Sequence, residues 1–131
     1  MSLVGALWKP NWYVYRKERE MTTISKEREV VTLINVFTVA PDNQQRLLDL
    51  LAEATESVMN GLPGFVSANL HKSIDGTKVV NYAQWRSRED FEAMLQNPEA
   101  MAHMREAGEI AEKFEPHLYE VSLVEEVERR A

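Results

Sequence analysis

The sequence predicts an α+β domain whose elements follow the order β-α-β-β-α-β. Three observations support this order. Residues 30–39 are rich in β-branched side chains and stop just before Pro41, which is typical of a strand. Residues 42–60 repeat apolar side chains at helical spacing. Residues 74–77 contain an Asp-Gly pair between two further strand-like runs, and such a pair tolerates the positive φ angles of a tight hairpin turn.

The side-chain pattern defines the first strand and the first helix. Residues 30–39 carry apolar side chains on both strand faces, so we expect this strand to be buried on both sides. The helix predicted over 42–60 ends at Gly61, with Pro63 just beyond it. Its apolar stripe consists of Leu47, Leu51, Ala54 and Val58.

The second half of the domain repeats this layout. Strands are predicted over 65–73 and 78–85, and Ser87 can cap the first amides of the next helix. Pro98 interrupts or kinks that helix, because proline lacks an N–H donor. Helical spacing resumes over 99–114 through Ala107, Ile110 and Phe114, and a last strand is predicted over 118–125.

This element order is the ferredoxin-like arrangement, a four-stranded antiparallel sheet with both helical regions on one face. The first strand is apolar on both sides, so the sheet face away from the helices also needs cover. A second copy of the sheet would supply it, because an exposed apolar face of that size is unfavourable in water. We therefore expect a homodimer.

The chain divides into three parts. Residues 30–125 form the predicted domain, and 126–131 a C-terminal tail. Residues 1–29 form an N-terminal extension or arm in which four aromatic side chains lie close together: Trp8, Trp12, Tyr13 and Tyr15. Two interpretations stay open, in which the aromatics pack on a partner subunit or Met21 is the natural start.

Composition excludes several function classes. The 131 residues hold 15 Lys and Arg against 21 Asp and Glu, a net charge of −6, which argues against binding a nucleic-acid backbone. The sequence has no cysteine, so disulfides and thiol chemistry are excluded. No apolar run reaches the roughly 18 residues that span a membrane, and no secretory signal is evident, so we expect a cytoplasmic protein.

Two asparagines stand in apolar strand faces. Strand alternation puts Asn35 on one face with apolar neighbours, and it puts Asn81 on one face with Trp85. A buried amide without a partner costs about 1 to 3 kcal/mol. Each asparagine is therefore expected to bond either to a neighbouring group or to a ligand.

One arginine and three histidines are the further candidates for a functional site. Arg105 lies on the last predicted helix, where an ion pair with Glu106 or Glu109 is the alternative to a site role. His103 borders the apolar stripe of that helix and either lines a pocket or is structural. His71 and His117 lie on other elements, and the histidines have no metal-binding spacing, so no metal site is expected.

Residues 31–124 resemble the antibiotic biosynthesis monooxygenase family, whose members are small dimeric α+β barrels of ferredoxin-like topology. The resemblance rests on five features: Asn35 in the opening strand, the turn Leu62-Pro63-Gly64-Phe65, the strand Asn81-Tyr82-Ala83-Gln84-Trp85, the helix start Ser87-Arg88-Glu89-Asp90-Phe91, and a final strand near Tyr119. The superfamily includes quinone-forming oxygenases, haem-degrading enzymes and proteins without a known reaction.

The resemblance implies a cofactor-independent monooxygenase, without metal or flavin, that oxidises a phenolic or polycyclic aromatic substrate with O₂ to a quinone. Asn35, Asn81 and Trp85 match the polar positions of the quinone-forming members, and Arg105 occupies a comparable place to an arginine used by some of them. The expected substrate contacts are Phe37, Phe91, Leu95 and His103. Phe91 stands where certain relatives have a tyrosine, so a phenol-assisted proton transfer is not carried over.

Two alternatives remain from the sequence. The same barrel can bind a small ligand, or only dimerise, without turnover. Haem-degrading relatives bind iron through a histidine about ten residues after the tryptophan, and here that position is Leu95.

Overall fold

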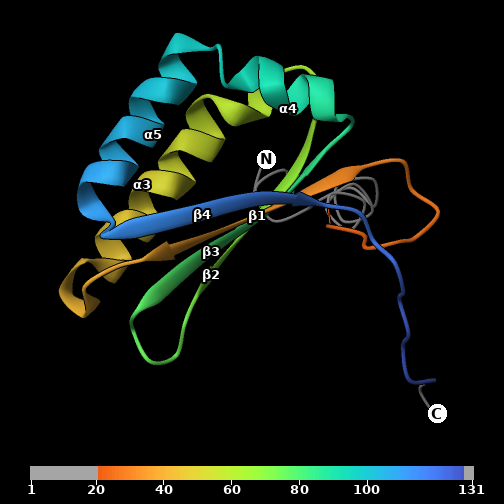
Figure 1. Ribbon diagram of the computed structural model, residues 1–131, viewed down its shortest axis with the longest axis horizontal. Helices are drawn as coiled ribbons and strands as arrows, with labels where there is room; N and C mark the ends of the chain where they lie inside the picture. The colour runs from red at the N-terminus through yellow and green to blue at the C-terminus, as the bar shows by residue number, and fades with distance from the viewer. Residues whose placement is uncertain (1–20, 129–131) are drawn as a thin grey trace, which may run out of the picture.

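The computed structural model describes residues 21–128 (Figure 1). The predicted N-terminal arm therefore lies outside the described residues over positions 1–20, and so does the end of the predicted tail, 129–131. The strands are β1 (Val31–Thr38), β2 (Phe65–Lys72), β3 (Lys78–Trp85) and β4 (Lys113–Tyr119). The helices are α3 (Gln44–Ser57), α4 (Arg88–Met94) and α5 (Pro98–Ile110), with 3-10 turns η1 (Pro41–Asn43) and η2 (Met59–Gly61).

The strands form one antiparallel sheet in the order β2-β3-β1-β4. Figure 1 shows α3, α4 and α5 together on one face of this sheet. This arrangement confirms the predicted ferredoxin-like α+β fold. Because β1 and β3 are the central strands, each has a neighbouring strand on both sides. Their side chains on the helix-facing side of the sheet lie beneath the helices.

Two of the helices, α4 and α5, begin at residues whose side chains cap the first turn. The Ser87 hydroxyl accepts a hydrogen bond from the Asp90 amide at 3.0 Å, and α4 starts there. The Asn97 side chain accepts from the Ala100 amide at 2.9 Å, and Pro98 occupies the first turn of α5. Proline is well tolerated there because the first amides of a helix have no intrahelical acceptor. Among the described helices, none has the length and apolar character needed to cross a membrane.

The turn before β2 depends on a glycine. Gly64 has a φ of 80°, which side chains other than glycine rarely adopt. A Cβ placed there would overlap the carboxylate of Asp90, at about 2.4 Å from its Cγ. The Gly64 carbonyl also accepts a hydrogen bond from the Arg86 amide at 2.6 Å. The turn therefore joins the start of β2 to the end of β3 and the start of α4.

The last strand differs from the prediction. The helix expected to run through Phe114 ends at Ile110, and the strand expected over 118–125 is found at Lys113–Tyr119. Ala111 leaves the helix in an extended conformation, with φ −77° and ψ 146°. Phe114 then pairs in register with Phe37 of β1, and their ring centroids lie 6.2 Å apart. The spacing of Ile110 and Phe114 matched a helix, but pairing with β1 decides the structure.

Beyond β4 the chain leaves the sheet. Residues 120–128 have no regular secondary structure and run away from the domain body (Figure 1). Both edge strands are irregular in composition or pairing. Pro116 lies in the middle of β4, and the pairing of β2 with β3 shifts register between Phe65 and Ser67.

The two faces of β1 differ in burial. Leu33, Asn35 and Phe37 face the helices and are buried. On the opposite face Thr32 is buried, but Ile34 and Val36 are only half-buried. In the single chain the opposite face is therefore only partly covered by residues 21–128, and burial of both faces, which was expected with a second sheet, stays a prediction.

Polar side chains occupy part of that opposite face. Gln84 is 1% exposed, its amide donates to the Thr23 carbonyl at 2.8 Å, and its oxygen accepts from the Ser67 hydroxyl at 2.8 Å. Thr22 donates to the Asn69 side chain at 2.6 Å. Residues 22 and 23, which belong to the predicted arm, are therefore bonded to the sheet.

Candidate functional site

A cavity of about 540 Å³ lies between the sheet and the helices. Cavities of this size suit small-molecule ligands. One wall is formed by the helix-facing residues of the central strands, and the other by residues of α3, η2, α4 and α5. The strand wall includes Leu33, Asn35, Phe37, Asn81, Ala83 and Trp85. Side chains of β4 complete the rim.

Asn35 and Asn81 lie directly opposite each other in the β1–β3 pairing. Residues paired in this way have Cβ atoms about 4.5 to 5.5 Å apart. Strand alternation turns both side chains toward the helices. The two amides therefore form one polar patch in the middle of an otherwise apolar strand wall.

Trp85 forms the end of that wall. Its side chain is 1% exposed and lies between two phenylalanines. The ring centroid of Phe65 lies 5.3 Å from that of the indole, with an angle of 80° between the ring planes. The corresponding values for Phe91 are 6.1 Å and 72°. Such edge-to-face contacts are favourable and fix ring orientation. The two phenylalanines thus restrict the orientation of the indole.

Three polar atoms of these residues are buried without a hydrogen-bond partner among residues 21–128: Oδ1 of Asn35, Oδ1 of Asn81 and Nε1 of Trp85. Leaving a buried polar group unpaired costs about 1 to 3 kcal/mol. The alternative in which each asparagine bonds to a neighbouring protein group does not hold within the described part of the chain. The cavity wall thus has unused hydrogen-bonding capacity.

Arg105 contributes the positive charge of the cavity lining. It lies on α5 and is exposed, so its guanidinium is at the rim rather than in the floor. Within the described residues it forms no ion pair, which removes the alternative of a salt bridge to Glu106 or Glu109. Among residues 21–128, those that line the cavity include no carboxylate, so an anionic ligand would meet no opposing acidic group from this part of the chain.

The remaining predicted site residues divide clearly. Phe37, Phe91 and Leu95 line the cavity. His103 does not, and one of its ring nitrogens, Nδ1, lies 3.0 Å from the Glu99 carbonyl oxygen of its own helix. The expectation that His103 faces the pocket therefore fails, because the imidazole turns back along α5.

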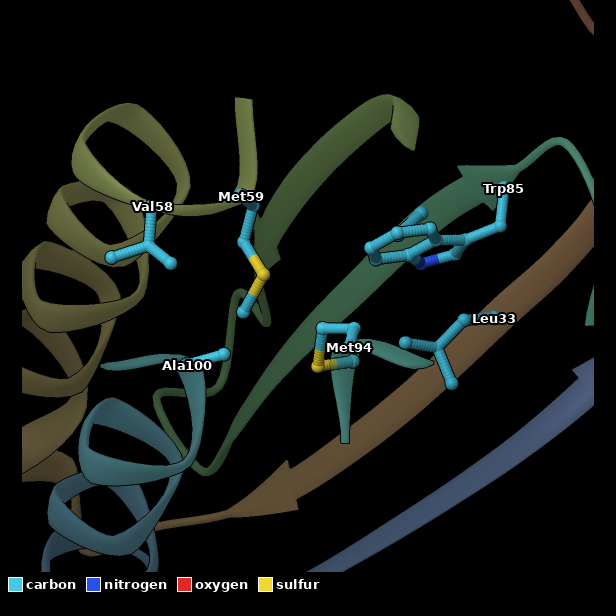
Figure 2. Close-up of a cluster of buried hydrophobic side chains, with 7 residues drawn as sticks. Leu33, Val58, Met59, Trp85, Met94 and Ala100 are labelled. Atoms are coloured by element: carbon cyan, nitrogen blue, oxygen red, sulfur yellow. The ribbon is translucent and has the colours of Figure 1, made fainter. Parts of the chain in front are cut away.

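Sequence reasoning missed the methionines of the helix wall. Four of the six methionines in the chain line the cavity: Met59, Met94, Met101 and Met104. Figure 2 shows Met59 and Met94 reaching from the helical side toward the strands that carry Leu33 and Trp85. The available signal was the i, i+3 spacing of Met101 and Met104, which places both on one side of a helix.

Metal-ligating side chains do not gather within residues 21–128, where no group of three His, Asp or Glu residues is close enough to hold an ion. His117 is the one histidine of the cavity lining. It packs edge to face against Tyr119, with ring centroids 6.4 Å apart. Strand alternation places both rings on the face of β4 away from the helices, so His117 borders the cavity with its backbone and its imidazole does not enter the site.

Comparison with known proteins gives a consistent result. Residues 30–106 match the sequence model of the family described as antibiotic biosynthesis monooxygenase. Over 83 residues the chain is 52% identical to tetracenomycin-F1 monooxygenase of Streptomyces glaucescens, which covers 63% of this chain and 74% of that protein.

Solved structures share the fold. SnoaB, a cofactor-independent oxygenase from Streptomyces nogalater, is 25% identical with a TM-score of 0.58, over 73% of this chain and 96% of that one. Rv0793 from Mycobacterium tuberculosis is 22% identical with a TM-score of 0.61, over 76% of this chain and 99% of that one.

The fold and the cavity define a small ferredoxin-like α+β protein with a mostly apolar ligand site between its sheet and its helices. Within that class the chain belongs to the antibiotic biosynthesis monooxygenase family. This membership confirms the resemblance identified from the sequence, and it supports a small-molecule monooxygenase as the kind of enzyme.

Proposed function

We propose that this protein is a cofactor-independent monooxygenase that oxidises a phenolic or polycyclic aromatic substrate with O₂ to a quinone. The observation that carries the proposal is the set of unpaired buried polar atoms on Asn35, Asn81 and Trp85 in the wall of an apolar cavity. The likeness to tetracenomycin-F1 monooxygenase and to SnoaB, a cofactor-independent oxygenase, supports the reaction class.

The chemistry balances when the substrate supplies the electrons. A deprotonated phenol passes one electron to O₂, and the superoxide and phenoxyl radicals recombine by forming a C–O bond at a ring carbon. The resulting hydroperoxide loses the ring proton and hydroxide together as water, which leaves a carbonyl. In total, one phenol and one O₂ give one quinone and one water, and the four electrons that reduce O₂ come from the ring.

The proposed roles follow from the cavity walls. The Nδ2 groups of Asn35 and Asn81 would donate hydrogen bonds to substrate oxygens, and donors aimed at developing negative charge are effective in a site that excludes water. Their unpaired Oδ1 atoms would accept hydrogen bonds from substrate hydroxyls. Trp85 would provide a flat surface and an indole donor. Arg105 at the rim would offset the charge of the phenolate. Phe37, Phe91 and Leu95 would contact the rings of the substrate.

Oxygen uptake and quinone absorbance, followed together on a panel of anthrones and hydroxylated aromatics, test this proposal. The assay contains a chelator and no added flavin or nicotinamide. We expect one O₂ consumed for each quinone formed. Ligand binding without oxygen uptake across the whole panel would contradict the proposal and favour a non-catalytic binding protein.

The haem alternative has its own readout. Leu95, at the position of the iron-binding histidine of haem-degrading relatives, lines the cavity and cannot ligate iron. A Soret band that saturates at one haem per chain, followed by haem breakdown with a reductant, would favour that alternative over quinone formation.

We further propose that the protein acts as a homodimer whose sheets face each other. The half-buried side chains of Ile34 and Val36 on the open face of β1 support this assembly. Light scattering at micromolar concentration should give about twice the chain mass of 15.1 kDa. A monodisperse monomer would rule it out.

A further inference from the structure

The two walls of the cavity are built from different kinds of side chain. The strand wall presents groups held by sheet register and by edge-to-face ring contacts, such as Asn35, Asn81 and Trp85. The helix wall presents four methionines: Met59, Met94, Met101 and Met104. Only two other methionines occur in the chain, so this residue type is concentrated at one surface.

The methionines do not all serve as ordinary core. Met59 and Met94 are buried, at 9% and 6% exposure, and belong to the cluster that contains Trp85 and Leu33 (Figure 2). Met101 and Met104 on α5 are only half-buried, because one side of each meets the cavity rather than another side chain. The wall therefore includes thioethers that have space in which to move.

Methionine is suited to such a position. Its unbranched side chain has three rotatable bonds, and its polarisable sulfur makes favourable contacts with aromatic rings. Leucine has similar volume but a branched, stiffer side chain, so an exchange between them keeps the volume of a core and changes its adaptability.

We propose that this methionine wall determines the substrate range, so that the cavity accepts planar fused-ring aromatics of different sizes while the strand wall holds the oxygenated edge of each. Only the class of ligand in this inference rests on the proposed function. The methionines move to fit the far rings, and the asparagines and Trp85 keep the same atoms in contact.

The test compares affinities for unreactive quinones of increasing size: hydroxylated naphthoquinone, anthraquinone and tetracenequinone. Binding is measured by fluorescence quenching in the full chain carrying Trp8→Phe and Trp12→Phe, which leaves Trp85 as the sole tryptophan. We expect the three dissociation constants to lie within about tenfold of one another. In the triple variant Met94→Leu, Met101→Leu, Met104→Leu the ratio of the largest to the smallest dissociation constant should increase by about tenfold or more. A poorly fitting group in an apolar pocket lowers affinity by about that factor.

Two matched controls separate flexibility from other effects. Met21→Leu makes the same exchange at an exposed residue outside the cavity and should leave the spread unchanged. Global replacement of methionine by norleucine removes every sulfur but keeps unbranched side chains, and it should retain the broad range. If the triple variant does not fold, the double variant Met101→Leu, Met104→Leu should widen the spread in the same direction.

The inference would be overturned if the spread of the three dissociation constants stayed unchanged in the folded leucine variants. It would also be overturned if that spread widened equally in the norleucine protein. Because the ligands are unreactive, these results are independent of oxygen uptake. If quinones of all three sizes bind but no substrate is turned over, only the proposed reaction is contradicted. If substrate is turned over but the range of ligand sizes is narrow and does not change in the leucine variants, only the role of the methionines is contradicted.

Discussion

The two faces of the sheet differ in whether their buried side-chain amides have hydrogen-bond partners. On the face away from the helices, the Gln84 amide is 1% exposed and is bonded to both Ser67 and the Thr23 carbonyl. On the helix-facing side, Asn35 is 3% exposed, and its Oδ1 and that of Asn81 have no partner within residues 21–128. An amide kept for structure is paired by the protein. The Thr32 hydroxyl on the face away from the helices is also buried without a partner in this part of the chain, but only on the helix-facing side do unpaired amides line a cavity, so a ligand is expected there.

The largest expected effect of breaking this contrast is on turnover. Asn35→Ala and Asn81→Ala should each lower kcat by about 10²- to 10³-fold, as loss of one donor to developing charge does elsewhere. The melting temperature should stay close to that of the parent, since the Oδ1 atom that each substitution removes has no hydrogen-bond partner within residues 21–128. Steady-state oxygen uptake and thermal unfolding measure the two quantities on the same samples.

Trp85 provides a graded comparison for this first experiment. Trp85→Phe should reduce turnover less than Trp85→Ala, because phenylalanine retains a flat ring and loses only the indole donor. Full activity in the double variant Asn81→Ala, Trp85→Ala would refute the proposed site.

The paired amide should behave in the opposite way. Gln84→Ala removes two hydrogen bonds and leaves the Ser67 hydroxyl without its acceptor, so we expect a loss of about 2 to 3 kcal/mol in the free energy of unfolding. The turnover of the folded fraction should change little, because Gln84 does not line the cavity. Urea unfolding provides the measurement, and a kcat loss as large as that of Asn81→Ala would abolish the contrast between the faces.

A smaller effect is expected at the turn that supports Trp85. Gly64→Ala places a side chain at positive φ, which costs about 1 to 2 kcal/mol. The new Cβ would also displace the Asp90 carboxylate from its position beside Ser87. Gly61→Ala is the matched control, since nothing lies within 4 Å of a Cβ added there. Equal unfolding free energies for the two variants would show that the turn tolerates a side chain.

The smallest effect is expected at the β2–β3 hairpin, far from either amide set. The pKa of Asp75 lies below its ordinary value of 3.8, because the Thr77 amide and hydroxyl and the Ser73 hydroxyl donate hydrogen bonds to the carboxylate. Its contribution to stability is therefore present above pH 3.8 and is lost as the pH falls through the lowered pKa. The stability difference between the parent and Asp75→Ala should shrink in this acidic range. A difference independent of pH would contradict the assignment.

Much of this site could be predicted from local pattern. Alternation along two strands was enough to put Asn81 and Trp85 on one face and Asn35 among apolar neighbours. Such reasoning works because side-chain direction in a strand repeats every two residues. The pairing register that sets Asn35 directly opposite Asn81 could not be read in this way, because it joins residues 46 positions apart.

Two side chains lie elsewhere than their helical spacing predicts. Phe114 continued a helical spacing, yet it lies in β4 because pairing with Phe37 replaces the last helical turn. His103 bordered an apolar stripe, yet its ring turns toward the Glu99 carbonyl. A strand partner far away in the sequence determines the position of Phe114, whereas a backbone oxygen one turn earlier in the same helix determines that of the His103 ring.

The irregular edge strands of the sheet affect how readily this protein can form fibrils. Exposed edge strands are templates for adding another chain, and aggregation begins there. Pro116 removes one backbone donor from the middle of β4, and the register shift after Phe65 disturbs the ladder of β2. Both ends of the sheet are thus poor starting points for cross-β growth. We therefore expect concentrated protein to associate through its faces and to resist forming fibrils.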